Sequence, residues 1–315
     1  MSEVSDGSSN RAKLSMSSTS THTLIAGDLQ AVFWPDQGML CASLRHRGVE
    51  LLRRVDNLDS ARSKGSTAGI PLLYPWANRL ASLHYQVAGQ EVFVDRASSL
   101  LHFDEHGLPM HGVPWPKLRW EVVSASEEKM SARLAWSRKD LLEVFPFPHQ
   151  VQLNTQIGPG ALTFETLVVA GSDSLVPITF GFHPYLGIPG IPRKEWTLRL
   201  PSMQRLRLDA QGIPSGEARP FPAAETLLGS TSYDDGFALD QDRAVFAITG
   251  GGYTIRVEFL EGFRFAQVFA PVAQELVALE PMTASTSALT SGQNLLLLQP
   301  GKQYRAAFQV AVDKS

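Results

Sequence analysis

The sequence has little of what several classes of protein require. Among its 315 residues is a single cysteine, Cys41, which excludes an internal disulfide and a cysteine-based metal centre. Lysines and arginines number 28 against 31 aspartates and glutamates, so the sequence lacks the excess of basic residues with which proteins bind nucleic-acid phosphates. No stretch approaches the roughly 20 uninterrupted apolar residues of a membrane-spanning helix. These absences predict a protein of a reducing compartment, the cytoplasm, with neither a nucleic acid nor a membrane as its partner.

The N-terminal segment, residues 1–22, is poor in apolar side chains. Eight serines and three threonines lie among the first 24 residues, and no apolar stretch of signal-peptide length occurs there. Such a segment buries too little apolar area to offset the entropy of ordering its backbone. A transit presequence is the alternative, and Glu3 and Asp6 argue against it because presequences are poor in acidic residues. We therefore predict a flexible tail followed by one domain over residues 23–315.

Beyond this tail, apolar residues alternate with polar ones along several segments. A period of two puts one set of side chains on the buried face of a strand and the other set toward solvent. Glycine and proline clusters separate these segments, and no window of 12 or more residues carries a helical stripe free of both. The pattern predicts an all-β chain folded as a single large antiparallel β-sandwich. The clearest strand segments are residues 151–157, 196–200, 253–259 and 308–312.

Two segments place polar residues next to rigid sequence. Asn78 and Arg79 follow the proline-containing, aromatic run 69–77, where they either decorate the surface or present amide and guanidinium donors to hydroxyl oxygens. His106 and His111 each precede a glycine, which lets the backbone approach a ligand closely. Their spacing supplies no third metal ligand, so we expect no metal and no other cofactor.

Two further segments put a titratable side chain at the end of an apolar strand. Pro184 holds the backbone of His183 extended, in the segment 181–186 that follows the apolar strand 175–180. Glu280 follows the apolar residues 277–279, and a carboxylate there costs several kcal/mol unless it is paired or active in proton transfer. Each of these two side chains is therefore either a structural partner or a catalytic acid or base.

Taken in order, these segments resemble the aldose 1-epimerase family, also called galactose mutarotases. Each motif is short, but together they are specific, because they occur in the family's order and at its broad spacing over residues 69–283. The resemblance implies a galactose mutarotase-like supersandwich of antiparallel strands, with a sugar held in an open cleft on one sheet. The matching motifs are Pro75-Trp76-Ala77-Asn78-Arg79, His111-Gly112, His183-Pro184-Tyr185, Asp234 with Phe237, and Glu280-Pro281-Met282-Thr283.

The resemblance also implies a reaction, the interconversion of the α and β anomers of a free hexose by ring opening and closure. Glu280 resembles the general base that takes the proton of the anomeric hydroxyl, and His183 resembles the general acid that protonates the ring oxygen. His111 resembles a second histidine that hydrogen-bonds near the ring oxygen. We expect the acid and the base on opposite sides of the hemiacetal. Because a neutral imidazole cannot donate this proton, we also expect a nearby carboxylate to raise the pKa of His183.

The sugar hydroxyls have their own candidate residues. Arg79 and Asp234 resemble the residues that hold them, with Asn78 as a helper, so the implied partner is a small-molecule aldose of the glucose or galactose type. Many family members have a second glycine where this sequence has Val113, which leaves His106 open as an alternative to His111.

Two other functions stay open. One branch of the family acts on hexose 6-phosphates and carries arginines beside its glycine and histidine motifs; here Ala68 precedes the glycine, although Arg62 and Lys64 could substitute. The other alternative is a carbohydrate-binding or regulatory protein on the same fold without turnover. The joint presence of Glu280, His183 and His111 favours an enzyme, and the lack of an arginine next to the glycine and histidine motifs favours an unphosphorylated sugar.

Overall fold

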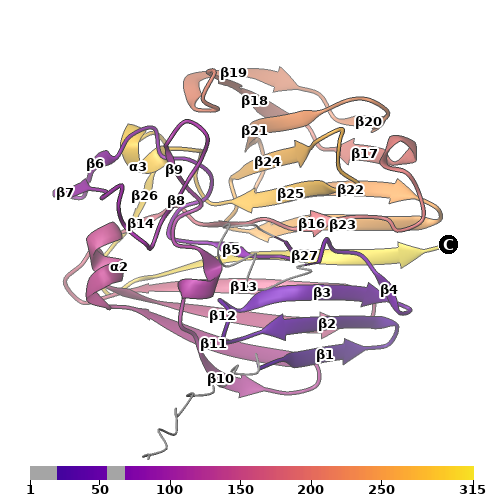
Figure 1. Ribbon diagram of the computed structural model, residues 1–315, viewed down its shortest axis with the longest axis horizontal. Coiled ribbons are helices and arrows are strands. Elements are labelled where there is room, and N and C mark those ends of the chain that lie inside the picture. Colours follow the sequence, from indigo (N-terminus) through magenta and orange to yellow (C-terminus); the bar gives the residue numbers. More distant parts are fainter. Residues whose placement is uncertain (1–19, 55–67) are drawn as a thin grey trace, which may run out of the picture.

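The computed structural model describes residues 20–54 and 68–315, and it is built almost wholly of antiparallel strands (Figure 1). Three sheets account for most of the chain. The largest has nine strands, in the spatial order β10 (Glu121–Ala125), β11 (Lys129–Trp136), β12 (His149–Gly158), β13 (Ala161–Ala170), β27 (Gln303–Lys314), β23 (Tyr253–Glu261), β22 (Ala244–Gly250), β17 (Thr197–Leu200) and β20 (Ala224–Leu227).

The second sheet carries most of the candidate site. Its strands are β19 (Pro214–Phe221), β18 (Met203–Leu208), β21 (Tyr233–Leu239), β24 (Phe265–Ala270), β25 (Val277–Met282), β15 (Gly181–Phe182) and β5 (Leu72–Leu73), with β16 (Tyr185–Leu186) also paired to β25. The third sheet consists of β1 (His22–Ala26), β2 (Leu29–Trp34), β3 (Leu40–His46) and β4 (Val49–Glu50).

Short elements complete the described fold. Three two-stranded ribbons pair β6 (His84–Val87) with β7 (Gln90–Phe93), β8 (His102–Phe103) with β9 (Pro109–Met110), and β14 (Val176–Ile178) with β26 (Leu296–Leu298). The helices are α2 (Lys139–Val144) and α3 (Ala288–Ser291), with single 3₁₀ turns at Trp115–Lys117 and Arg193–Glu195. Among the residues that the structure describes, no helix is long and apolar enough to cross a membrane.

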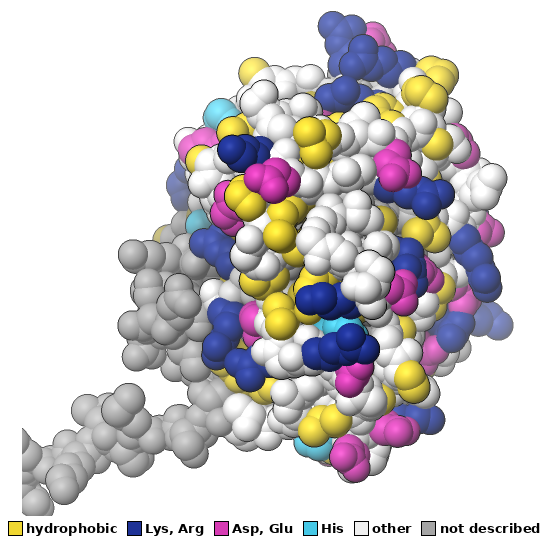
Figure 2. Space-filling view, turned by 90° about the vertical axis from the view of Figure 1, so that its right-hand side faces the viewer, with side chains coloured by type: hydrophobic (Ala, Val, Ile, Leu, Met, Phe, Trp, Pro, Cys, Tyr) yellow, Lys and Arg dark blue, Asp and Glu magenta, His cyan; other side chains and the backbone are white. Residues whose placement is uncertain are grey.

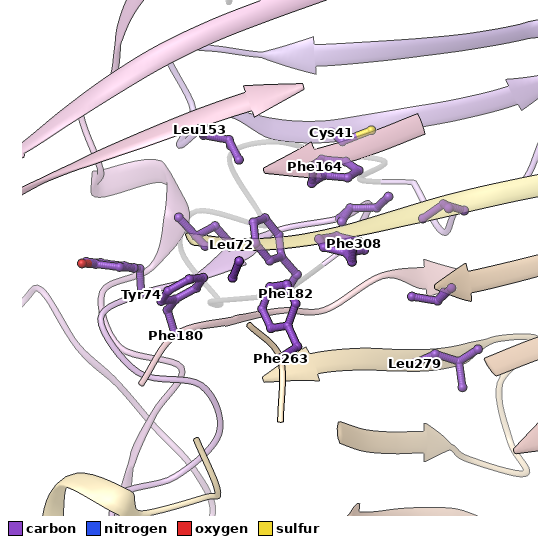
Figure 3. Packing of buried hydrophobic residues seen from close by; sticks show 14 of the residues in the cluster. Cys41, Leu72, Tyr74, Leu153, Phe164, Phe180, Phe182, Phe263, Leu279 and Phe308 are labelled. Carbon is purple, nitrogen blue, oxygen red and sulfur yellow. The ribbon is translucent and has the colours of Figure 1, made fainter. Parts of the chain in front are cut away.

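The core lies between the nine-stranded sheet and the two smaller sheets (Figure 3). Phe33 of β2 packs against Phe164 of β13 with ring centroids 6.0 Å apart, and Phe182 of β15 packs against Phe308 of β27 at 4.9 Å. Both smaller sheets therefore cover one face of the large sheet, as the layers of a sandwich do. The predicted all-β, antiparallel sandwich is confirmed.

The segments in which apolar and polar residues alternate form strands, as predicted. Residues 151–157, 253–259 and 308–312 fall inside β12, β23 and β27, and the burial of β12 and β23 alternates residue by residue. The face of the molecule in Figure 2 carries acidic and basic side chains interspersed, in keeping with the formal net charge of −3.

Some predictions fall on residues outside the described part of the chain. These residues include Arg62, Lys64 and all of the predicted tail except its last three residues. The strand β1 begins at His22, the last residue assigned to that tail. The tail and the single domain after it stay predictions.

Candidate active site

Glu280 lies in β25, at the centre of a row of residues that crosses the second sheet. The strands β15 and β16 both pair with β25 in the same register. This register places His183, which lies between β15 and β16, opposite Glu280. The strand is interrupted there because Pro184 has no N–H group to donate to β25. On the other side of β25, Gln267 of β24 pairs with Glu280. Residues directly opposite one another share a face of a sheet. Strand pairing therefore brings an imidazole, a carboxylate and an amide together.

The imidazole and the carboxylate are in direct contact. Nε2 of His183 lies 3.1 Å from Oε1 of Glu280, and the two side chains are only 6% and 2% exposed. The ring of Tyr185 stacks on His183, with centroids 4.0 Å apart and planes inclined by 16°. The sequence analysis expected the acid and the base on opposite sides of the hemiacetal, and it did not foresee that they touch each other. Two groups in contact can still reach both oxygens of a hemiacetal, since these are bonded to the same carbon.

Each member of this pair keeps one polar atom without a hydrogen bond. Oε2 of Glu280 and Nδ1 of His183 are buried and have no partner among the described residues. A buried acceptor left unpaired costs about 1–3 kcal/mol, so such atoms are rare in folded proteins. The unpaired Glu280 oxygen is suited to accept a hydrogen bond from a hydroxyl group of a ligand.

Burial shifts the pKa values of the pair in opposite directions. Desolvation raises the pKa of Glu280 well above its ordinary value, and the nearby charge of Asp234 raises it further. Desolvation lowers the pKa of His183 well below its ordinary value, with His111 adding to the effect. The prediction of a raised pKa for His183 is therefore wrong. Both directions favour the uncharged form of the pair, with the exchangeable proton on Glu280 rather than on His183.

His111 lies beside His183 and is held by the backbone of Asn78. The two rings meet at 85° with centroids 5.7 Å apart. The N–H of Asn78 donates to Nδ1 of His111 at 3.2 Å, and the N–H of His111 donates to the carbonyl of Asn78 at 2.9 Å. Since Nδ1 accepts, the ring proton is on Nε2, which makes His111 a donor. Burial lowers the pKa of His111 to about 3, so the ring stays neutral.

Backbone strain accompanies this contact. Asn78 has φ 57° and His111 has φ 60°, in the left-handed region of backbone conformation that residues other than glycine rarely adopt. Gly112 follows at φ 64°, and a Cβ there would lie 2.3 Å from the carbonyl oxygen of Tyr74. Strain of this kind persists where the surroundings impose it, and it concentrates at functional sites.

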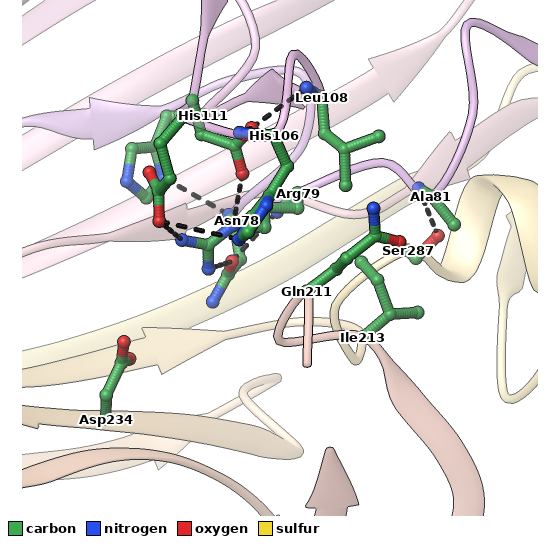
Figure 4. Close-up of polar contacts among 12 residues, drawn as sticks. Asn78, Arg79, Ala81, His106, Leu108, His111, Gln211, Ile213, Asp234 and Ser287 are labelled. Atoms are coloured by element: carbon green, nitrogen blue, oxygen red, sulfur yellow. Dashed lines mark hydrogen bonds and ion pairs between the residues drawn. The ribbon is translucent and has the colours of Figure 1, made fainter. Parts of the chain in front are cut away.

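Arg79 is held by a buried carboxylate (Figure 4). Its Nε donates to Oδ2 of Asp104 at 2.6 Å, and the side chains of Arg79 and Asp104 are 11% and 1% exposed. The other Asp104 oxygen accepts the backbone N–H groups of His106 and Leu108. Although burial raises the pKa of Asp104, these hydrogen bonds and Arg79 lower it overall, so it is ionised at neutral pH. Asp104 therefore fixes the orientation of the Arg79 guanidinium group.

Asp234 is the exposed member of the group. It lies in β21, and its Oδ1 accepts a 2.7 Å hydrogen bond from Nε2 of Gln267, whose side chain is buried. Gln267 thus links Asp234 to the row that contains Glu280.

The structure brings five of the six predicted site residues into contact with one another. Glu280, His183, His111 and Asn78 form one chain of contacts, and Asn78 also contacts Arg79. Gln267 connects the sixth residue, Asp234, to Glu280. His106, the alternative to His111, lies in a surface turn with its side chain 36% exposed, 3.7 Å from Glu105.

Two residues of the site escaped the sequence analysis. Gln267 has a weak signal, as the one strongly polar side chain in the otherwise apolar strand Phe265–Ala270, whereas Asp104 has none. No cluster of three or more metal-ligating side chains occurs within residues 20–54 and 68–315.

Comparison with known proteins gives three kinds of similarity. A model of the aldose 1-epimerase family matches residues 20–311. The uncharacterized protein YihR of Escherichia coli K12 is 24% identical over 253 residues, which are 76% of this chain and 77% of YihR. A galactose mutarotase-like protein from Clostridium acetobutylicum has a similar structure, with a TM-score of 0.81, 15% identity and coverage of 93% of this chain and 95% of the other. The Slr1438 protein of Synechocystis is similar over the full length of both chains, with a TM-score of 0.75 and 22% identity.

Proposed function

The chain belongs to the aldose 1-epimerase family, and on that premise we propose that it interconverts the α and β anomers of a free hexose of the glucose or galactose type. The observation that carries this proposal is the buried contact of Glu280 with His183, which leaves one carboxylate oxygen without a hydrogen-bond partner among the described residues. Anomer exchange requires that a proton is removed from the anomeric hydroxyl and that another is delivered to the ring oxygen, and both oxygens are bonded to C1. A carboxylate and an imidazole that touch each other meet this need.

The proposed reaction begins with the shared proton on His183. Glu280 takes the proton of the anomeric hydroxyl while His183 gives its proton to the ring oxygen. The bond from C1 to the ring oxygen breaks, the C1 carbonyl forms, and the sugar opens to its aldehyde. Rotation about the C1–C2 bond followed by closure, with both roles reversed, yields the other anomer.

The shared proton explains how a histidine with a lowered pKa serves as the acid. Moving the proton from Glu280 to His183 crosses one 3.1 Å contact and leaves the net charge of the pair unchanged. Hydrogen bonds from the sugar to the Glu280 carboxylate favour its ionised form and so move the proton to His183. The acid and the base are therefore readied together when the substrate binds.

The remaining residues hold the sugar. His111 donates a hydrogen bond from Nε2 to an oxygen at or near the sugar's ring oxygen, because its Nδ1 already accepts the N–H of Asn78. Arg79 offers guanidinium N–H groups to hydroxyl oxygens, and Asp234 accepts from hydroxyl groups. Gln267, between Asp234 and Glu280, contributes its amide.

Proton NMR of glucose and galactose in D₂O with the purified protein tests this proposal. We expect faster exchange between the two anomeric H1 signals, without loss of H1 to deuterium, because ring opening breaks no C–H bond. Saturation-transfer signals from bound sugar without faster exchange would instead identify a non-catalytic sugar-binding protein. Exchange of glucose 6-phosphate alone would identify the phosphorylated alternative.

A further inference from the structure

Two loops that contact Arg79 share one sequence pattern. In residues 103–109 and in residues 208–214, an aspartate follows an apolar residue, a glycine comes three positions later, and an aliphatic residue and a proline follow the glycine. The first loop joins β8 to β9 and the second joins β18 to β19. In both, the residue before the aspartate pairs with the proline. Two distant segments of the chain therefore form the same kind of hairpin.

The hydrogen bonds inside the two loops match. Oδ1 of Asp104 accepts the N–H groups two and four positions later at 2.9 Å each, and Oδ1 of Asp209 accepts the corresponding groups at 2.8 and 2.9 Å. The glycine N–H donates to the aspartate carbonyl at 3.0 Å in the first loop and at 3.1 Å in the second. Gly107 and Gly212 have φ 72° and 75°, a conformation that favours glycine. Each loop is thus held in shape by its own aspartate.

The two loops meet Arg79 at different nitrogens. Asp104 of the first loop accepts a hydrogen bond from Nε. On the second loop, a Cβ added to Gly212 would lie 3.1 Å from Nη1 and 3.7 Å from Cζ of Arg79. Ordinary contacts between such atoms are about 3.5–4.0 Å, so a side chain at this position would displace the guanidinium by a few tenths of an ångström. Figure 4 shows Arg79 together with Gln211 and Ile213, which flank Gly212.

The second contact restricts a motion that the first one allows. A guanidinium held only through Nε can still turn about that hydrogen bond, whereas a contact at Nη1 keeps the planar group in one orientation. Nη1 also donates to Oδ1 of Asn78, but at 3.4 Å this hydrogen bond is long and orients the group weakly. The N–H groups left for a ligand then point in a fixed direction, which precise binding of a hydroxyl group requires.

We propose that Gly212 is a positioning residue for Arg79, and that together with Asp104 it holds the guanidinium in the orientation that binds the sugar hydroxyls. The inference rests on the proposed anomer exchange and adds a residue to it. Gly212 acts through Arg79, because the absence of a side chain leaves room for Nη1. Asp209 acts one step further away, because its carboxylate fixes the loop that carries Gly212.

The test measures kcat and KM for glucose by optical rotation in Gly212→Ala and in a matched control, Gly89→Ala. Gly89 has φ 76° in the turn between β6 and β7, and a Cβ there would meet nothing within 4 Å. Both variants carry similar backbone strain, so both should lower the melting temperature. Only Gly212→Ala should raise KM, by about threefold to tenfold, with kcat changed less than about twofold. A wild-type KM in Gly212→Ala, or an equal rise in Gly89→Ala, would overturn the inference.

A double substitution tests whether Gly212 acts through Arg79. In the Arg79→Ala background, Gly212→Ala should raise KM no further, because the group that it displaces is absent. The same fold-change in both backgrounds would show an effect that bypasses Arg79, and the inference would fail.

Asp209 gives a test that leaves Gly212 in place. Asp209→Asn keeps an oxygen that accepts the two loop N–H groups, whereas Asp209→Ala removes it. We expect Asp209→Ala to raise KM about threefold and Asp209→Asn to keep the wild-type value. Equal KM values in wild type and Asp209→Ala would contradict the role of the loop. Absence of exchange with every hexose in wild type would contradict the proposed function itself, which keeps the two failures distinct.

Discussion

Replacing Glu280 with glutamine should separate catalysis from folding. Glutamine keeps the size of the side chain and can hydrogen-bond His183 across the same 3.1 Å contact, but it cannot accept a proton. General acid–base catalysis contributes about 10² to 10⁴-fold, or about 2.7 to 5.4 kcal/mol of transition-state stabilisation. We therefore expect kcat for anomer exchange to fall at least about 10²-fold, while the affinity for sugar changes little. Optical rotation measures the rate, and isothermal calorimetry measures the affinity.

The same substitution should not weaken the fold. Because burial raises the pKa of Glu280, the native state binds more protons than the unfolded state above the unfolded pKa, near 4.3. Wild type therefore loses stability as pH rises through the window between the two pKa values, by up to about 1.4 kcal/mol per pH unit. Glutamine has no such loss, so in denaturant titrations the variant should gain stability relative to wild type as pH rises above the unfolded pKa.

Glu225→Gln, on an exposed position of β20, is the matched control and should change neither activity nor stability. Wild-type exchange rates in Glu280→Gln would refute the assignment of the base. A variant that loses stability relative to wild type as pH rises would refute the reasoning from burial.

Three other outcomes follow from the site. Arg79→Ala should raise KM about tenfold with a smaller effect on kcat, because the guanidinium holds hydroxyls in ground and transition states alike; a change confined to kcat in saturation curves would contradict this. Since the pKa of Glu280 is raised and that of His183 is lowered, we expect no step in kcat/KM near pH 6.5, the ordinary pKa of imidazole; a step there would show an independently titrating histidine. Exchange should survive exhaustive treatment with EDTA, and a loss restored by a divalent ion would establish a metal.

The sequence predicted the strands better than it predicted their pairing. Period-two alternation needs only local residues, which is why the segment 151–157 falls inside β12. The apolar approaches to His183 and Glu280 predicted two strand-end residues. His183 does follow the end of β15, whereas Glu280 lies inside β25. Their contact depends on a register between distant segments; the resemblance to a family predicted that the two residues share a site, but not that they touch each other.

The failures of prediction also have physical causes. The predicted direction of the His183 pKa shift was wrong because desolvation lowers the pKa, with His111 adding to the effect, and a sequence does not show the burial of a single ring. Asp104 escaped notice because an aspartate in a polar loop looks like turn sequence; its importance comes from the ion pair with Arg79.

The central claim is that this protein catalyses anomer exchange through a carboxylate and an imidazole in contact. The most direct measurement is the optical rotation of freshly dissolved α-D-glucose or α-D-galactose with folded wild-type protein, corrected for the spontaneous rate. We expect a first-order rate that rises in proportion to protein concentration and that Glu280→Gln returns nearly to the buffer value. A rate equal to that of buffer at every protein concentration, for both sugars, would contradict the claim.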